Sequence, residues 1–157
     1  MKLSKKGEYA LRALIALGLA ASAGDDLMTI GEMARAQHIP ENFLQVILFE
    51  LKAAGIVVSL RGKGGGFRLG LPPEDIVVGD IVRRLDGPLA PIRCVSLSAY
   101  EKCSCPDEAN CGLRALVGRV RDALSEILDR TTLADLIGKQ CPAGRVTADP
   151  LSSVRPN

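Results

Sequence analysis

The sequence lacks the patterns that would assign a common enzymatic or membrane function. No Gly-x-x-x-x-Gly-Lys-Ser/Thr motif occurs, and the glycines of residues 62–66 lead into an expected strand rather than opening a helix, so a nucleotide-binding loop is excluded. There is no Cys-x-x-Cys motif, and the single histidine, His38, is not paired with a cysteine, which argues against a thiol oxidoreductase. The apolar run near the N-terminus is shorter than a bilayer span, and no membrane partner is expected.

What remains is the composition of a small folded protein. The chain has 157 residues without tryptophan, 47% hydrophobic and 24% charged, as in an ordinary soluble domain. Its net charge of +2 is uneven, because residues 1–72 hold nine basic against six acidic residues and residues 73–157 hold eleven against twelve. The basic front half suits a nucleic-acid partner, although surface solubility produces the same split.

The first 24 residues imitate a secretory signal, with a basic start, an apolar run and small residues at 21–24. We interpret them instead as an amphipathic helix, because Glu8 interrupts the basic leader and apolar residues recur at helical spacing from Tyr9. A cytoplasmic location follows from this interpretation. In that compartment clustered cysteines indicate metal or redox chemistry rather than structural disulfides.

A helix-turn-helix is predicted after this first helix. Thr29 and Glu32 form a capping box that starts a helix at Ile30, and residues 37–40 form a turn that ends in a proline suited to the next helix. The second helix of the pair runs over residues 41–54 and stops at Gly55. Its expected inward residues are Phe43, Leu44, Ile47, Leu48 and Leu51.

A β-hairpin wing follows, which favours a DNA-binding module over a generic helical pair. Residues 56–60 and 67–69 are predicted strands, and the glycine-rich basic loop between them can approach a phosphate backbone while Arg61 enters a minor groove. The alternative is a plain hairpin. The outward stripe of the preceding helix holds Asn42, Gln45, Phe49 and Lys52, of which the amides suit adenine edges and the lysine suits phosphate. Candidate DNA contacts are therefore Asn42, Gln45, Lys52, Arg61, Gly62, Lys63, Gly64 and Lys5.

The second half predicts a short helix over residues 76–85, an irregular loop over 89–110 and a long helix over 111–130, followed by a helical turn at 132–137. The long helix carries one apolar stripe, which indicates pairing with a second subunit, or docking back on its own first helix. The fold class expected is mainly α with a small β-hairpin wing: a winged helix-turn-helix over 1–72, the cysteine loop and dimerisation helix over 73–138, and a flexible tail over 139–157 that includes Cys141.

The chain resembles the IscR/NsrR/CymR-type bacterial winged helix-turn-helix regulators over residues 1 to about 138. The residues that carry the resemblance are 3–11 (LSKKGEYAL), 55–57, 61–69 (RGKGGGFRL), 78–82 and the cysteine region. The resemblance implies a dimeric transcription factor, and many such regulators hold an iron–sulfur cluster whose state tunes DNA affinity.

Four of the five cysteines, at positions 94, 103, 105 and 111, fall within eighteen residues. Thiolates suit iron–sulfur clusters, zinc and copper(I). The resemblance implies Cys94, Cys105 and Cys111 as ligands of a [2Fe–2S] or [4Fe–4S] cluster, with Cys103 as an alternative for the middle position. Some relatives use a histidine three residues beyond the last cysteine, where this chain has Arg114; others use an acidic first-helix residue of the opposite subunit, which Glu8 matches.

The sequence therefore predicts a homodimer that binds a double-stranded DNA operator under the control of an iron–sulfur cluster. Glu8 also has a plain interpretation as a first-turn acidic residue favoured by the helix dipole. A four-cysteine zinc site and a cluster-free disulfide switch stay open, although structural zinc usually takes Cys-x-x-Cys pairs. A winged helix that serves only protein interaction is the remaining alternative.

Overall fold

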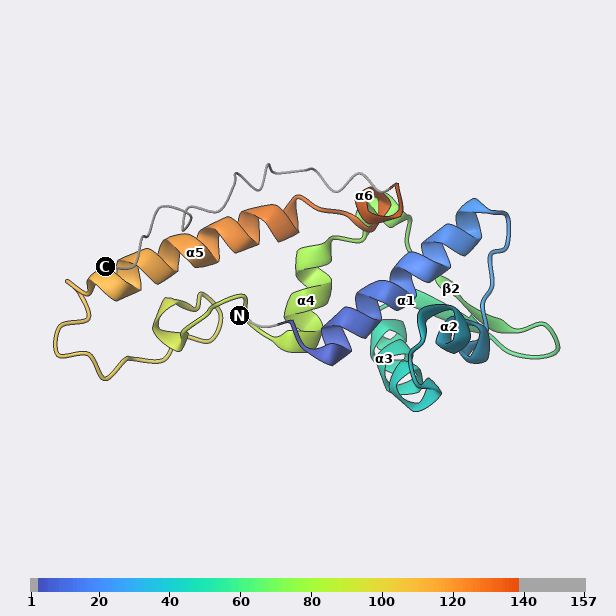
Figure 1. The fold of residues 1–157 in the computed structure, drawn as a ribbon, viewed down its shortest axis with the longest axis horizontal. Coiled ribbons are helices and arrows are strands. Elements are labelled where there is room, and N and C mark those ends of the chain that lie inside the picture. The colour runs from blue at the N-terminus through green and yellow to red at the C-terminus, as the bar shows by residue number, and fades with distance from the viewer. Residues whose placement is uncertain (1–2, 139–157) are drawn as a thin grey trace, which may run out of the picture.

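The computed structural model describes residues 3–138. The elements in chain order are α1 (Lys5–Ser22), α2 (Ile30–Gln37), α3 (Glu41–Ala53), β1 (Val57–Leu60), β2 (Gly66–Leu69), α4 (Val78–Asp86), α5 (Gly112–Asp129) and α6 (Leu133–Ile137), with the short 3₁₀ helices η1 (Pro73–Asp75) and η2 (Arg93–Val95). α1 to β2 gather at one end of the molecule, and α5 extends away from them towards the other (Figure 1). The predicted tail at 139–157, with Cys141, lies outside the described residues.

The first helix forms as the apolar spacing predicts. The hydroxyl of Ser4 caps α1 by accepting from the backbone N–H of Gly7 at 3.0 Å, which satisfies one of the free amides of the first turn. Its apolar face, which includes Ala10, Ala13, Leu14 and Leu17, is buried in the main core against α3, α2 and α6. Within residues 3–138, no helix combines the length and the apolar character that a membrane crossing needs.

The helix-turn-helix forms as predicted. The hydroxyl of Thr29 accepts from the backbone N–H of Glu32, and the Glu32 carboxylate accepts from the backbone N–H of Thr29, so the capping box is complete. α2 ends in a left-handed turn at His38 (φ 51°). α3 then starts after Pro40 and ends before Gly55, whose φ of 73° permits the C-terminal turn.

One predicted core residue of α3 is misplaced. The fully buried side chains of the helix are Leu44, Ile47, Leu48 and Leu51, whereas Phe43 is 50% exposed. Phe43 packs edge-to-face against Tyr9 of α1, with ring centroids 6.0 Å apart. The helix is therefore turned so that Phe43 lies at the margin of the interface with α1 rather than beneath it.

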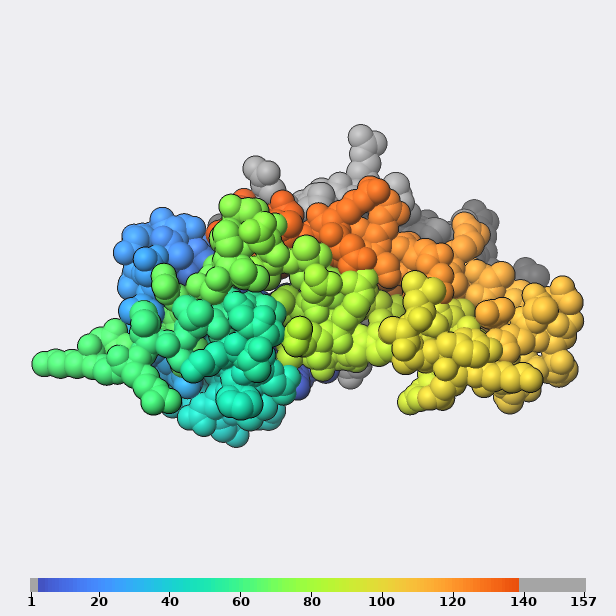
Figure 2. All heavy atoms as spheres, turned by 180° about the vertical axis from the view of Figure 1, so that it is seen from behind, coloured from blue at the N-terminus to red at the C-terminus, as the bar shows by residue number. Residues whose placement is uncertain are grey.

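The wing is a two-stranded antiparallel hairpin that pairs Val57 with Leu69 and Leu60 with Gly66. Met28 adds an isolated bridge to Phe67, which fastens the hairpin to the segment before α2. The loop between the strands turns through Gly62 (φ 103°) and Gly64 (φ 82°), conformations that other residues rarely adopt. The hairpin projects from the body of the molecule (Figure 2).

The second half joins the first through α4 and α6. α4 packs against α1 and α5, and its Val78 and Val82 form a small second core with Leu89, against which Leu128 packs. α4 begins two residues later than predicted, because Ile76 continues an extended segment whose carbonyl accepts from the N–H of Leu133 at 2.8 Å. The sequence left open whether α5 docks back on α1. In the structure the main contacts of α5 are with α4 and η2 instead.

Candidate functional site

The segment between α4 and α5, residues 87–111, carries the four clustered cysteines and is called the cysteine loop. It lies beside the first half of α5 and is anchored to this helix by two arginines. The Arg114 Nε donates to the carbonyl of Cys94 at 3.3 Å, and the Arg121 Nη1 donates to the carbonyl of Val95 at 2.5 Å. Both acceptors belong to η2, and the side chains of Cys94 and Val95 are buried. The start of the loop is therefore fixed to the helix that follows it.

The end of the loop is the N-terminus of α5 itself. Cys111 is the N-cap residue, and its Sγ accepts from the backbone N–H of Arg114 at 3.5 Å. This hydrogen bond lowers the pKa of the Cys111 thiol, because a helix N-terminus stabilises a thiolate. Sequence reasoning missed this capping role, although the position of the cysteine directly before the helical pattern was the signal for it.

The four thiols lie along one cavity of about 270 Å³. Cys103 neighbours both Cys94 and Cys105, and Cys105 also neighbours Cys111. Hydrogen bonding with Cys103 and Cys111 raises the pKa of Cys105 to about 12, while burial raises that of Cys94. All four are free thiols.

The donor set fits an iron–sulfur cluster in its chemistry, since four soft sulfur ligands from a loop and a helix start share one cavity. Within residues 3–138 the side chains of His, Cys, Asp and Glu form no group of three or more placed to hold a metal ion. The cysteines thus stand as neighbours in a chain of contacts rather than as a closed coordination site. Cys103 and Cys105 both line the cavity, so the geometry does not separate the two candidates for the middle ligand.

Glu8 is not among the residues that line the cavity of the four cysteines in its own chain. Its carboxylate pairs with Lys5 at 2.8 Å and with Arg12 at 3.2 Å, and the hydrogen bond from Lys5 lowers the pKa of Glu8. A second contact of Arg12, to the carbonyl of Gln37, reaches the turn between α2 and α3 and was not anticipated.

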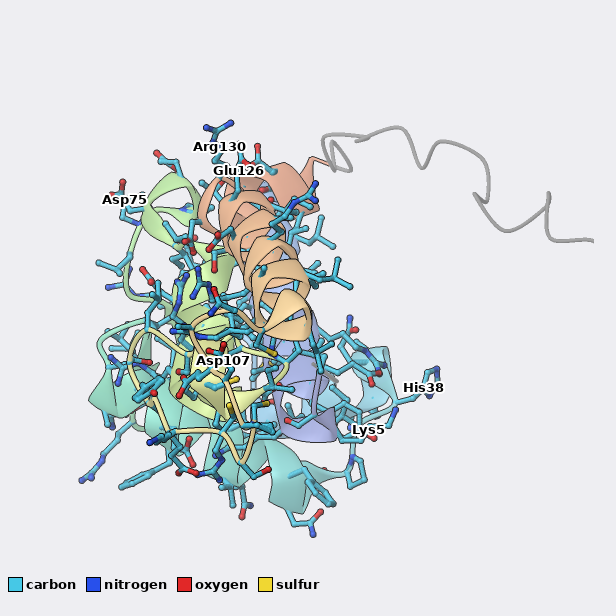
Figure 3. The ribbon with its side chains drawn as sticks, turned by 90° about the vertical axis from the view of Figure 1, so that its left-hand side faces the viewer. Lys5, His38, Asp75, Asp107, Glu126 and Arg130 are labelled. Atoms are coloured by element: carbon cyan, nitrogen blue, oxygen red, sulfur yellow. The ribbon has the colours of Figure 1, made fainter. Side chains whose placement is uncertain are left out.

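His38 lies at the edge of the molecule, away from the loop that carries Asp107 (Figure 3).

The predicted DNA-facing residues form two exposed surfaces. Asn42, Gln45 and Lys52 are exposed on α3, and Lys52 Nζ donates to Ser59 Oγ of β1 at 2.5 Å. The wing tip exposes all four of its predicted contacts, Arg61, Gly62, Lys63 and Gly64.

Lys5 is exposed on the first turn of α1, where it pairs with Glu8 and lies 5.7 Å from the centre of the Tyr9 ring. Lys6, on the same turn, pairs with Glu50 of α3 at 2.7 Å. The first turn of α1 therefore carries basic groups beside the exposed surface of α3, although each of these lysines already has an acidic partner.

The apolar stripe of α5 is largely exposed. None of the side chains of α5 is buried, and Leu113, Leu116, Val120 and Ile127 are exposed hydrophobic residues along one side of the helix. Such a continuous apolar face on a projecting helix marks an interaction surface. The same helix thus carries the cysteine loop at its N-terminus and an open apolar face along its length.

A family profile and individual relatives match this chain over most of its length. The Rrf2 profile, described as an iron-dependent transcriptional regulator, matches residues 3–139. A helix-turn-helix-type regulator of Rhodobacter capsulatus described as rrf2-like is 38% identical over 94% of this chain and 99% of its own length. The regulator NsrR of Bacillus subtilis is 35% identical over 87% of this chain and 90% of its own.

A solved structure shows the same fold. The structure of CymR, described as the global cysteine regulator of B. subtilis, superposes with a TM-score of 0.74 at 35% identity, covering 88% of this chain and 98% of that one. The comparison agrees with the mainly helical architecture and its two-stranded wing.

Proposed function

The chain belongs to the Rrf2 family of transcriptional regulators, and from this premise we propose that it is a cytoplasmic homodimer whose affinity for a DNA operator is set by an iron–sulfur cluster in the cysteine loop. It is not an enzyme, since the family consists of regulators. In this proposal residues 1–72 bind DNA, and residues 73–138 provide the sensor and the dimer seam.

The DNA half of the proposal is supported by the two exposed surfaces of the winged helix. Asn42 and Gln45 can donate to and accept from adenine edges in the major groove, while Lys52 is placed for phosphate. The wing tip offers Arg61 and Lys63 on a loop whose glycines leave the backbone open to close approach. A dimer then reads two half-sites about one helical turn apart.

The cluster half of the proposal is supported by the shared cavity of the four thiols. Cys94, Cys105 and Cys111 would hold the cluster, with Cys103 as an alternative to Cys105, and a bound cluster supplies a redox-active group that oxidants and nitric oxide can alter. Glu8 of the opposite subunit is the proposed fourth ligand. To serve as one, it must leave Lys5 and Arg12 of its own helix.

One observation carries the proposal: the cysteine cavity and the exposed apolar stripe belong to the same helix. Cys111 caps α5, and Arg114 and Arg121 tie the loop to its first turns. A change in the loop therefore acts on the helix that we propose to form the two-fold seam, and small rotations there alter the spacing of the recognition helices.

A thiol switch is the second candidate, favoured by the contact between Cys105 and Cys111. In that reaction the two thiols form a disulfide and lose two protons and two electrons to an oxidant such as hydrogen peroxide, which is reduced to water. The switch needs no metal. It would act on the same N-terminus of α5.

The test is anaerobic purification with absorption spectroscopy and with iron and sulfide quantitation. We expect a coloured protein that contains both elements, and we expect Cys111→Ala to lose them while the neighbouring Ser104→Ala keeps them. DNA binding, measured by fluorescence anisotropy, should change when the cluster is removed. A colourless protein that contains only zinc refutes the cluster, and a metal-free protein whose DNA affinity responds to peroxide supports the thiol switch.

A further inference from the structure

The surface of α3 that points away from the core carries apolar side chains at its centre. The buried residues Leu44, Ile47, Leu48 and Leu51 define the inward face. Opposite to them, at successive spacings of four and three residues, lie Asn42, Val46 and Phe49, which we call the outer row of α3. Val46 is 57% exposed and Phe49 is 74% exposed.

Packing within the subunit does not explain these two side chains. The single aromatic pair among residues 3–138 joins Tyr9 to Phe43, so Phe43 has a partner of its own and Phe49 takes part in no aromatic contact. Beside the outer row lies a shallow, mainly apolar cavity of about 300 Å³ lined by Lys6, Asn42, Phe43, Val46 and Ile47. Phe43, Val46 and Phe49 together form an exposed apolar patch on this helix, and such patches mark binding surfaces more often than single exposed residues do.

The neighbours of the outer row are those of a DNA-reading helix. Asn42 and Gln45 offer amides that suit adenine, and Lys52 lies seven residues, about two turns, beyond Gln45 on the same side of the helix. The wing contributes Arg61 and Lys63 without acidic residues at its tip. Glu50, one turn beyond Val46, is paired with Lys6, so the remaining surround of amides and basic groups matches a polyanion with readable base edges better than an apolar protein partner.

We propose that Val46 and Phe49 contact the C5-methyl groups of thymines in the major groove and so determine sequence specificity. This inference rests on the proposed DNA-binding function. The thymine methyl is the one apolar group on the base edges of that groove, and it belongs to the base pair whose other edge suits an asparagine or glutamine. Val46 and Phe49 therefore read the thymine of A·T pairs while Asn42 and Gln45 read the adenine, and each half-site carries at least two such pairs.

The first experiment recovers a binding duplex from a randomised double-stranded library and synthesises it with thymine or with uracil at single positions. Uracil keeps every hydrogen bond of thymine and lacks only the methyl group. We expect replacement at two positions of each half-site to weaken binding about fourfold per methyl, the factor that corresponds to about 0.8 kcal/mol for one buried carbon group.

The second experiment assigns the methyl contacts to residues. In Phe49→Ala the difference between thymine and uracil should vanish at one position, and in Val46→Ala at the other, while the variants still prefer the selected duplex to a random one. Leu19→Ala, which alters an exposed leucine on α1, is the control and should keep both differences. Circular dichroism checks that the variants are folded.

The outcomes separate this inference from the function on which it rests. If no duplex is enriched from the library, the DNA-binding proposal fails. If a duplex is enriched but uracil binds as well as thymine, or if the loss persists unchanged in Phe49→Ala and Val46→Ala, the outer row does not read methyl groups.

Discussion

Truncation of one leucine on the stripe of α5 tests the proposed dimer seam quantitatively. Leu116 is 57% exposed in the single subunit, so more than half of its surface is available for burial by a partner. Leu116→Ala removes the equivalent of three CH₂ groups, worth about 2.4 kcal/mol for complete burial at about 0.8 kcal/mol each.

Only the exposed part of that surface can be buried in the dimer, which reduces the loss to about 1.4 kcal/mol per subunit. A two-fold interface contains the residue twice, so the dimer loses about 2.8 kcal/mol. The dissociation constant of the dimer should therefore rise about 100-fold. The folded subunit itself should lose no more than about 1 kcal/mol, the share that belongs to the part of the side chain already covered within it.

Sedimentation velocity over a dilution series measures this change. The matched control is Leu19→Ala, the same substitution at a leucine that is 47% exposed near the end of α1, remote from α5 (Figure 1). We expect the control to dimerise like the wild type. A dissociation constant that is unchanged in Leu116→Ala, or that rises equally in both variants, would show that the stripe does not form the seam.

Three further substitutions test the fold through urea or acid denaturation. Thr29→Ala removes the capping box of α2 and should lower the free energy of unfolding by about 1 kcal/mol. Leu44→Ala, at a fully buried site, should cost about 2–5 kcal/mol. Asp129→Asn weakens a partly exposed, bidentate pair with Arg83 and should cost no more than about 1 kcal/mol at neutral pH. Because Arg83 lowers the pKa of Asp129, the wild-type advantage is complete above the ordinary aspartate pKa and should vanish as the pH falls through the lowered value.

Local signals allowed the winged helix to be predicted from the sequence. Each helix boundary here is set by residues close to it in the sequence. The examples are the capping box at Thr29, the proline before α3 and the glycine of positive φ at position 55. The hairpin follows in the same way from β-branched residues around a glycine loop. These features needed no knowledge of distant contacts.

Residues at the margin of an interface could not be placed in this way. Helical spacing alone puts Phe43 on the broad apolar side of α3, but the position of Tyr9 on α1 decides how far the buried face extends. The start of α4 is also determined by residues far away in the sequence. The Val78 N–H donates to the carbonyl of Thr131 at 2.9 Å, and the carbonyl of Ile76 accepts from the N–H of Leu133. Periodicity identifies such elements, and long-range contacts fix their ends and orientation.

The cysteine loop is the extreme case, because spacing states which donors are present and not where they point. Cys103 and Cys105, separated by one residue, both reach the same cavity, so neither their order nor their burial selects a ligand. Both ends of the loop are attached to α5. Arg114 and Arg121 of this helix bind the start of the loop, and Cys111 at the end of the loop is the N-cap residue of the helix. Because the loop is attached at both ends to one helix, a rearrangement of the loop around a bound group must also exert a force on that helix. The long helix is therefore the element on which a sensor in this position must act.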